Sequence, residues 1–272
     1  LEMTGLLCRL EPGDEVIMPS FTFMSTANAF LMRGAKVVFA DTLGDVPNID
    51  PDEIERLITQ KTKAVVVVHY SGLACEMDRI MTIAADHGLF VIEDAAHAID
   101  SYYRGKPLGS IGHFGAFSFH ETKNIIAGEG GLLIVNSKDL EKRAEVIWEK
   151  GTNRAAFYRG EVDKYGWVDI GSSFLPSDSI AAFLYAQLLR FDRIQERRKK
   201  NWWTYYELLK PLEEQGWVKC PVIPDFATVN GNLFYITVES GETRDKLLGY
   251  LKQQGITSVF HYLPLHSSLY FM

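Results

Sequence analysis

The chain has 272 residues, of which 47% are hydrophobic and 23% charged, and its formal net charge is −7. This balance is typical of a globular protein and argues against nucleic-acid binding by bulk positive charge. No apolar run is long enough to cross a bilayer, and no signal-peptide pattern is present, so we expect no membrane contact.

The three cysteines, Cys8, Cys75 and Cys220, lie far apart in the sequence and form no C-x-x-C pair. Structural zinc sites usually contain such pairs, so we expect no metal centre. An odd number of cysteines without a disulfide framework is typical of a reducing compartment. We therefore expect a cytoplasmic protein.

Strands and helices alternate through the first hundred residues. The run KAVVVVHY is rich in β-branched residues, as is typical of a strand buried on both faces. Helices are indicated by proline and acidic residues at one end and by glycines at the other. The expected strands are 15–19, 36–41, 63–70 and 89–94, and the expected helices are 25–34, 51–59 and 76–88. This alternation predicts a mostly parallel sheet covered by helices.

The pattern changes after Phe114. Strands are expected at 114–120 and 131–136, a helix at 139–148, a long ordered loop at 151–177, and helices from 178 to about 215. A strand at 233–238, a helix at 243–255 and the run TSVFHYL then predict a second α/β unit. We expect a large domain over 1–195 and a smaller one over 196–272. The abrupt ends, Leu1 and SSLYFM, predict a fragment that lacks the start of the first domain and the end of the second.

Two residues lie where open parallel sheets bind their ligands, beyond the carboxyl ends of strands: Asp94 and Lys123. Neither a G-x-G-x-x-G after the first strand nor a Walker lysine loop is present, and GEGG at 128–131 precedes a strand, which predicts a turn. A lysine amine and a carboxylate suit pyridoxal phosphate, which needs a Schiff-base partner and a partner for its pyridine nitrogen. A solvated lysine and a helix-capping aspartate are the alternatives.

Three segments occur in the order found in one enzyme family: EPGDEVIMPSFTFMSTANAF, VIEDAAHAIDSYYRGKPLGSIGHFGAFSFHETKN and GEGG. They resemble the DegT/StrS-type sugar-nucleotide aminotransferases. The resemblance implies the aspartate-aminotransferase fold (fold type I), with a large, mostly parallel α/β domain and a smaller C-terminal α/β domain. It also implies a homodimer with shared sites, pyridoxal 5'-phosphate as cofactor, glutamate as amino donor and a nucleotide-linked keto sugar as acceptor.

The resemblance also implies individual roles. Lys123, in SFHETKN, matches the Schiff-base lysine, and Asp94, in EDAAHA, matches the partner of the pyridine nitrogen. His97 stands near the phenolic oxygen of the cofactor, Phe23, in PSFTF, stacks on its ring, and Ser118 binds its phosphate.

Three of these residues also have a purely structural interpretation. His97 could be a satisfied polar residue at a helix start, and Ser118 could bond only to its local backbone. Phe23 could be a core phenylalanine, with Phe21 as the residue that stacks instead.

Within the family, the runs KGTNR, DIGSS and VFHYLPLH most resemble members that make dTDP-4-amino-4,6-dideoxygalactose for lipopolysaccharide or enterobacterial common antigen. Relatives with histidine in place of the lysine are dehydratases, so Lys123 favours transamination. The alternatives are a pyridoxal-dependent dehydratase or lyase, and a homologue that binds the cofactor without turnover. The phosphate loop of the family lies before Leu1, and Leu175 replaces an asparagine that reaches the neighbouring subunit, with Ser172 or Ser173 as substitutes.

Overall fold

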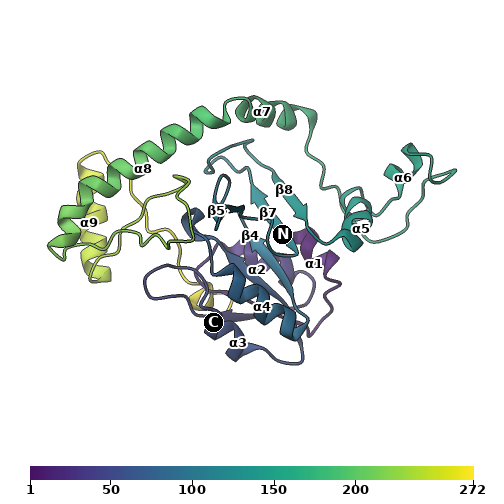
Figure 1. Ribbon diagram of the computed structural model, residues 1–272, viewed down its shortest axis with the longest axis horizontal. Coiled ribbons are helices and arrows are strands. Elements are labelled where there is room, and N and C mark those ends of the chain that lie inside the picture. Colours follow the sequence, from purple (N-terminus) through teal and green to yellow (C-terminus); the bar gives the residue numbers. More distant parts are fainter.

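The computed structural model describes residues 1–272, and its centre is a six-stranded sheet in the order β2-β1-β3-β4-β7-β8 (Figure 1). Neighbouring strands run parallel except β8, which is antiparallel to β7. The strands are β1 Glu15–Pro19, β2 Lys36–Ala40, β3 Thr62–Val68, β4 Phe90–Asp94, β7 Phe114–Ser118 and β8 Gly131–Val135, and a small hairpin joins β5 Tyr102–Tyr103 and β6 Lys106–Pro107. The expected α/β class with a mostly parallel sheet is confirmed.

Each face of the sheet is buried under its own set of helices, because successive strand side chains point to opposite faces. Val16 and Met18 belong to a core with residues of α1, α2 and α5, whereas Ile17 belongs to a core with residues of α3 and α4. These helices are α1 Glu2–Leu7, α2 Met24–Leu31, α3 Pro51–Leu57, α4 Met77–His87 and α5 Lys138–Trp148.

The helix ends follow the local signals in the sequence. Asp50 caps α3 by accepting a hydrogen bond from the Asp52 amide at 2.9 Å, and Pro51 occupies the first helical position. Gly88 ends α4 in the left-handed conformation, at φ 65°. Elements in this half of the chain therefore lie within a few residues of their predicted positions.

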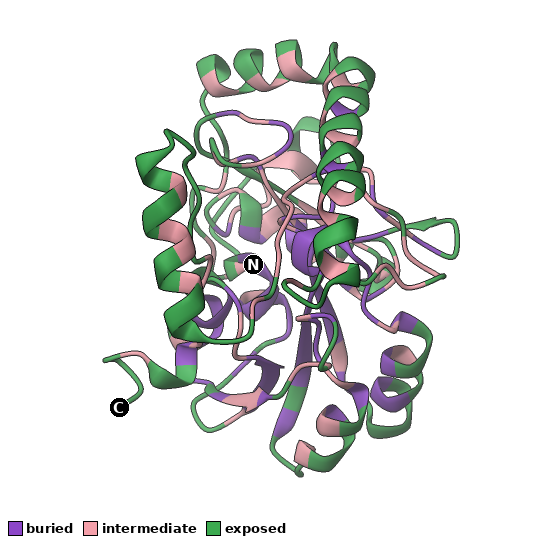
Figure 2. Cartoon of the chain, turned by 90° about the vertical axis from the view of Figure 1, so that its left-hand side faces the viewer, coloured by how far each residue is buried: buried purple, intermediate pink, exposed green.

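The second half of the chain extends away from the sheet in two directions. The expected loop 151–177 contains the short helix α6 Arg154–Tyr158 and projects on the side opposite to α8 and α9 (Figure 1). The other helices are α7 Asp178–Leu188, α8 Phe191–Glu214 and α9 Gly241–Gln253, with 3-10 turns at Tyr70–Gly72 and Leu265–Ser267. Figure 2 shows buried residues gathered in the sheet and its covering helices, whereas the long helix α8 is mostly exposed. None of the helices has both the length and the apolar character needed to cross a membrane.

The predicted strand at 233–238 is wrong. This segment is irregular and makes only an isolated bridge, between Thr237 and Lys219. A strand needs a neighbouring strand for its backbone groups. Here the carbonyl of Leu233 instead accepts hydrogen bonds from the Trp202 indole at 3.0 Å and the Ser71 hydroxyl at 2.8 Å.

The structure confirms only part of the rest of the expected second α/β unit. The helix predicted at 243–255 is confirmed as α9, but the run TSVFHYL is irregular and contains no strand. The boundary placed after residue 195 falls inside α8, near its start. The division into domains 1–195 and 196–272 stays a prediction.

Candidate active site at the carboxyl edge of the sheet

Side chains from three strands meet at one edge of the sheet. Asp94 ends β4 and Ser118 ends β7, and the two strands are direct neighbours, with Asp94 opposite Ala116. Phe23 follows β1 and is the N-cap residue of α2. Since these strands are parallel, their carboxyl ends lie at the same edge, which is where ligands of such sheets bind.

Asp94 is buried and held in one orientation by donors on both carboxylate oxygens. The Thr26 hydroxyl donates to Oδ2 at 2.7 Å, and the Ala96 amide donates to Oδ1 at 3.1 Å. Thr22 Oγ1 lies 2.9 Å from the Thr26 hydroxyl and continues the chain of hydrogen bonds. Sequence reasoning identified Asp94 but missed both threonines, whose only signal is their spacing of four residues at the start of α2.

Lys123 lies in the turn between β7 and β8, where its amide donates to the carbonyl of His120 at 3.0 Å. Burial lowers the pKa of the Lys123 ammonium, and the nearby Asp94 carboxylate opposes this effect. A lowered pKa increases the fraction of free amine near neutral pH. Lys123 is therefore not an ordinary solvated lysine, and its amine is available as a nucleophile or base.

His97 is buried beside this lysine. Its Nδ1 accepts a hydrogen bond from the Ser71 amide at 3.3 Å, so the neutral ring carries its proton on Nε2. The pKa of His97 lies well below its usual value, mainly because the ring is buried. The charge of Lys123 and, to a smaller extent, that of His261 lower it further. The ring is neutral at physiological pH and can donate one hydrogen bond from Nε2.

An aromatic cluster borders the same edge. The Tyr70 hydroxyl lies 2.9 Å from Nδ1 of His261, and the Phe21 ring lies 5.3 Å from that of Tyr70 and 5.6 Å from that of Tyr262. Burial, and then the Asp94 charge, raise the pKa of Tyr262. Phe23 lies 6.2 Å from Tyr262 but keeps 50% of its surface exposed, so one face of its ring is free.

The other expected residue is Ser118, which is half-buried at the end of β7. Its Oγ accepts a hydrogen bond from the His120 amide at 3.3 Å, and its own proton has no acceptor in the chain. The local structural role is therefore present, and the hydroxyl is still able to donate to a ligand.

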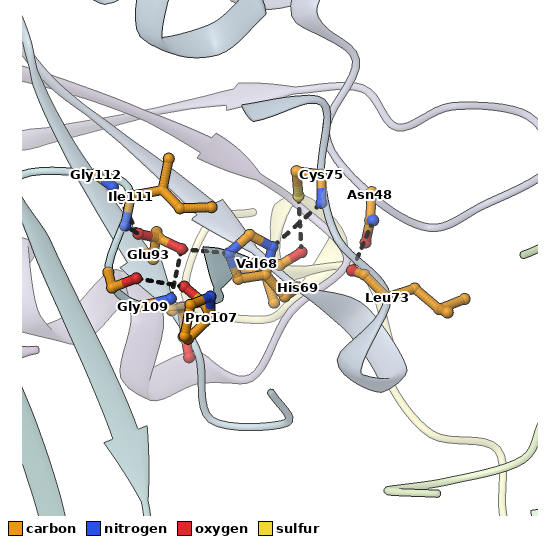
Figure 3. Close-up of polar contacts among 12 residues, drawn as sticks. Asn48, Val68, His69, Leu73, Cys75, Glu93, Pro107, Gly109, Ile111 and Gly112 are labelled. Carbon is orange, nitrogen blue, oxygen red and sulfur yellow. Dashed lines mark hydrogen bonds and ion pairs between the residues drawn. The ribbon is translucent and has the colours of Figure 1, made fainter. Parts of the chain in front are cut away.

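Glu93, the residue before Asp94 on β4, is a buried carboxylate that makes several hydrogen bonds (Figure 3). Glu93 accepts from the amides of Gly109 at 2.6 Å, Ile111 at 2.7 Å and Gly112 at 2.6 Å. Its Oε2 also lies 2.9 Å from Nε2 of His69, the residue that follows β3. The ends of β3 and β4 and the loop before β7 are thereby joined at one point.

The geometry defines the protonation of this buried pair. Nδ1 of His69 accepts from the Cys75 amide at 3.2 Å, so the neutral ring donates from Nε2 to Glu93. Burial alone would raise the pKa of Glu93, but the His69 ring and the Gly112 and Gly109 amides lower it below its ordinary value. Sequence reasoning missed Glu93, although an acid inside the apolar run LFVIED must be paired.

Buried amide side chains connect the lysine turn to α8. Asn124, next to Lys123, donates to Oε1 of Gln195 on α8 at 2.9 Å and to the carbonyl of Asn230 at 3.0 Å. Asn230 in turn donates to the carbonyl of His97 at 2.6 Å. The backbones that carry Lys123 and His97 are therefore held by one network that spans more than a hundred residues of sequence.

Comparisons with known proteins identify the family of this chain. A model of the DegT/DnrJ/EryC1/StrS aminotransferase family matches residues 1–272. The spore coat polysaccharide biosynthesis protein SpsC of Bacillus subtilis is 37% identical over 267 residues, which cover 96% of this chain and 68% of SpsC.

Solved structures give the same result. The aminotransferase TlmJ from Streptoalloteichus hindustanus matches with a TM-score of 0.89 at 27% identity, over 100% of this chain and 71% of TlmJ. The PLP form of Spr1654 from Streptococcus pneumoniae matches with a TM-score of 0.89 at 26% identity, over 99% of this chain and 72% of that one.

The substitution Glu93→Gln should lower the free energy of unfolding by about 3 kcal/mol, because an amide group would face donors that now bond to a carboxylate. Urea unfolding followed by circular dichroism measures the change. Glu55→Gln, at an exposed position of α3, is the matched control and should change stability by less than about 0.5 kcal/mol. Equal effects of the two substitutions would contradict the structural role of Glu93.

His97 should make stability depend on pH. The ordinary pKa of a histidine ring is 6.5, and His97 has a lower pKa in the native protein. Below pH 6.5 the ring is therefore protonated in the unfolded chain but not in the native protein. The free energy of unfolding consequently falls as the pH falls towards the native pKa. His97→Gln should reduce this slope by up to about 1.4 kcal/mol per pH unit. Thermal unfolding between about pH 7 and about pH 5 measures it, with the exposed His87→Gln as control. An unchanged slope in His97→Gln would show that the native ring takes up the proton.

Proposed function

Because the chain belongs to the DegT/DnrJ/EryC1/StrS aminotransferase family, we propose that it transfers an amino group from glutamate to the keto group of a nucleotide-linked deoxysugar. The family comprises sugar aminotransferases, and the cofactor is pyridoxal 5'-phosphate. The observation that carries the proposal is the half-buried Lys123 amine, with its lowered pKa, beside Asp94 and His97.

The side chains at this edge fit that cofactor. Lys123 offers a free amine for its aldehyde carbon, and Asp94, held by Thr26 and Ala96, offers a fixed carboxylate for its ring nitrogen. Phe23 offers an open aromatic face. When bound, pyridoxal phosphate draws electrons away from the reacting carbon of the substrate.

We infer that Lys123 moves the proton in both halves of the reaction. Its Nζ removes the proton from the α-carbon of glutamate in the first half. In the second half, it delivers a proton at C4 of the sugar. A base must be largely free at the working pH, and the lowered pKa of Lys123 meets this requirement.

The other residues of the site would hold and orient the cofactor. Asp94 would keep the pyridine nitrogen protonated, and His97 would donate a hydrogen bond from Nε2 to the phenolic oxygen. The Ser118 hydroxyl would donate a hydrogen bond to the phosphate. The rings of Tyr70 and Tyr262, whose centroids lie 6.3 Å apart, give this edge an apolar border, and a less polar surrounding would strengthen each of these polar contacts.

The finer proposal is that the acceptor is dTDP-4-keto-6-deoxyglucose and the product dTDP-4-amino-4,6-dideoxygalactose, for a cell-surface polysaccharide. The run VFHYLPLH supports it, because His261 and Tyr262 of this run border the site. The similarity to SpsC supports a role in surface polysaccharide synthesis. We place the protein in the cytoplasm because its three cysteines are free and buried.

We further propose that the protein works as a homodimer. The projecting segment around α6 exposes large apolar side chains, among them Trp167 at 83% and Tyr158 at 70% of their surface. Monomeric proteins rarely expose such groups together. A second copy of the chain would cover them.

A pyridoxal-dependent dehydratase or lyase on the same sugars is the enzymatic alternative, and a homologue without turnover is the other. Transamination consumes glutamate and releases 2-oxoglutarate, whereas neither alternative does so. Release of 2-oxoglutarate in step with loss of the keto sugar would establish the transfer.

Lys123→Ala should abolish amino transfer and covalent capture of the cofactor. Borohydride treatment with pyridoxal phosphate, followed by peptide mass spectrometry, should label Lys123 in the native protein and leave the variant unlabelled. Lys106→Ala, at an exposed lysine of β6, is the control and should retain the label. Labelling of another lysine in the native protein would overturn the assignment.

Trp167→Ser should weaken the dimer by about thirtyfold or more, the effect expected for a central aromatic residue of an interface. Analytical ultracentrifugation over a concentration series measures the dissociation constant. Tyr250→Ser, an exposed aromatic of α9, serves as control. A protein that is monomeric before substitution, with cofactor bound, would refute the homodimer.

A further inference from the structure

A cavity of about 410 Å³ lies between the lysine turn and the junction of α7 and α8. Its wall contains Lys123 together with four arginines, Arg190, Arg193, Arg197 and Arg198, and its acidic lining is Glu121 alone. The volume is within the range of small-molecule sites. A basic cavity is unexpected in a chain whose net charge is −7.

Three of these arginines have no partner in the chain. Arg193 and Arg197 are four residues apart on α8 and so lie on one face of the helix, and Arg190 is the N-cap residue that precedes it. No carboxylate lies within ion-pair distance of any of them, although other arginines, such as Arg56 and Arg159, pair with glutamates. These three arginines are exposed, and no ion pair within the chain compensates their charge, so they are available to an anionic ligand.

Arg198 has a different function in the same wall. Its Nη2 donates to the carbonyl of Lys123 at 3.0 Å, and its Nη1 lies 3.5 Å from the carbonyl of Gly231. Burial lowers the pKa of its guanidinium. Arg198 therefore fixes the lysine turn against α8, and a ligand held by the three free arginines would lie beside the backbone of Lys123.

We propose that this cavity binds the diphosphate of the nucleotide-linked substrate. A guanidinium presents two parallel N–H groups that match two phosphate oxygens, and a diphosphate carries charge enough to engage several such groups. In a sugar nucleotide, only the sugar ring separates the diphosphate from C4. Phosphates held next to Lys123 would therefore leave C4 within reach of the catalytic edge. This inference rests on the proposed function for the identity of the sugar, but not for the binding of the diphosphate.

The direct test is binding of dTDP and of inorganic pyrophosphate to the holoprotein, measured by titration calorimetry. The double variant Arg193→Gln/Arg197→Gln should weaken dTDP binding by about a hundredfold, since each lost charge-assisted contact costs about tenfold. Lys210→Gln, which removes one positive charge farther along the same helix, should leave the affinity unchanged. Unchanged dTDP affinity in the double variant would overturn the proposal.

Kinetics distinguish the diphosphate from the other anion of the reaction, glutamate. The double variant should raise the KM for the sugar nucleotide and leave the half-reaction with glutamate unchanged. An equal loss in the glutamate half-reaction would overturn the proposal in favour of a dicarboxylate site. Arg193→Lys/Arg197→Lys, which keeps the charge but not the paired N–H groups, should lie between the double glutamine variant and the native protein. It provides the comparison if the glutamine variant folds poorly.

The experiments distinguish a failure of the proposed function from a failure of the cavity assignment. If no sugar nucleotide accepts an amino group but dTDP binding still depends on Arg193 and Arg197, the cavity assignment stands and the assigned reaction fails. If amino transfer proceeds normally in the double glutamine variant, the reaction stands and the cavity assignment fails.

Discussion

The buried carboxylate of Glu93 is the interaction on which the candidate site depends most. It gathers three amides of the 109–112 loop and the ring of His69 around the end of β4. Consecutive residues of a strand point to opposite faces, so an anchor at Glu93 on one face fixes the direction of Asp94 on the other. The adjacent strand accommodates the loop because Gly115 has no side chain: a Cβ there would collide with the backbone of Gly109. Glu93 thus fixes the orientation of the Asp94 carboxylate, although Glu93 itself lies on the other face and is not part of the site.

The other half of the site depends on contacts that are distant in sequence. Asn124 and Asn230 join the lysine turn, the backbone of His97 and helix α8. Asn230 fits because Gly72 lies against it, in a left-handed conformation at φ 79°, where any Cβ would overlap the amide. Removing one partner from such a network leaves the others buried without hydrogen bonds, which makes the network cooperative. The position of α8 and the position of the lysine are therefore set together.

The parts of this structure that could be predicted from sequence are those with local causes. The strands of the first half follow from apolar runs, and the ends of α3 and α4 follow from Asp50, Pro51 and Gly88. The segment 233–238 has the same kind of apolar run, but a strand also requires a neighbour, and no local signal supplies one. Lys123 and Asp94 were found because their chemistry is distinctive at strand ends. Thr26, Tyr70 and His261 were not assigned roles because their significance comes only from what the fold places beside them.

The charges of Asp94, His97 and Lys123 also affect one another. His97 accepts from the Ser71 amide and is buried next to Lys123, and both conditions favour its neutral ring. A neutral His97 adds no positive charge beside the lysine, and the Asp94 carboxylate attracts the ammonium form of Lys123. Burial still lowers the pKa of Lys123 despite this attraction. The lysine turn is held against α8 by the hydrogen bond from Arg198 to the carbonyl of Lys123. The reactivity of Lys123 is consequently a property of the folded edge as a whole, and weakening that packing would return the lysine towards the behaviour of a solvated side chain.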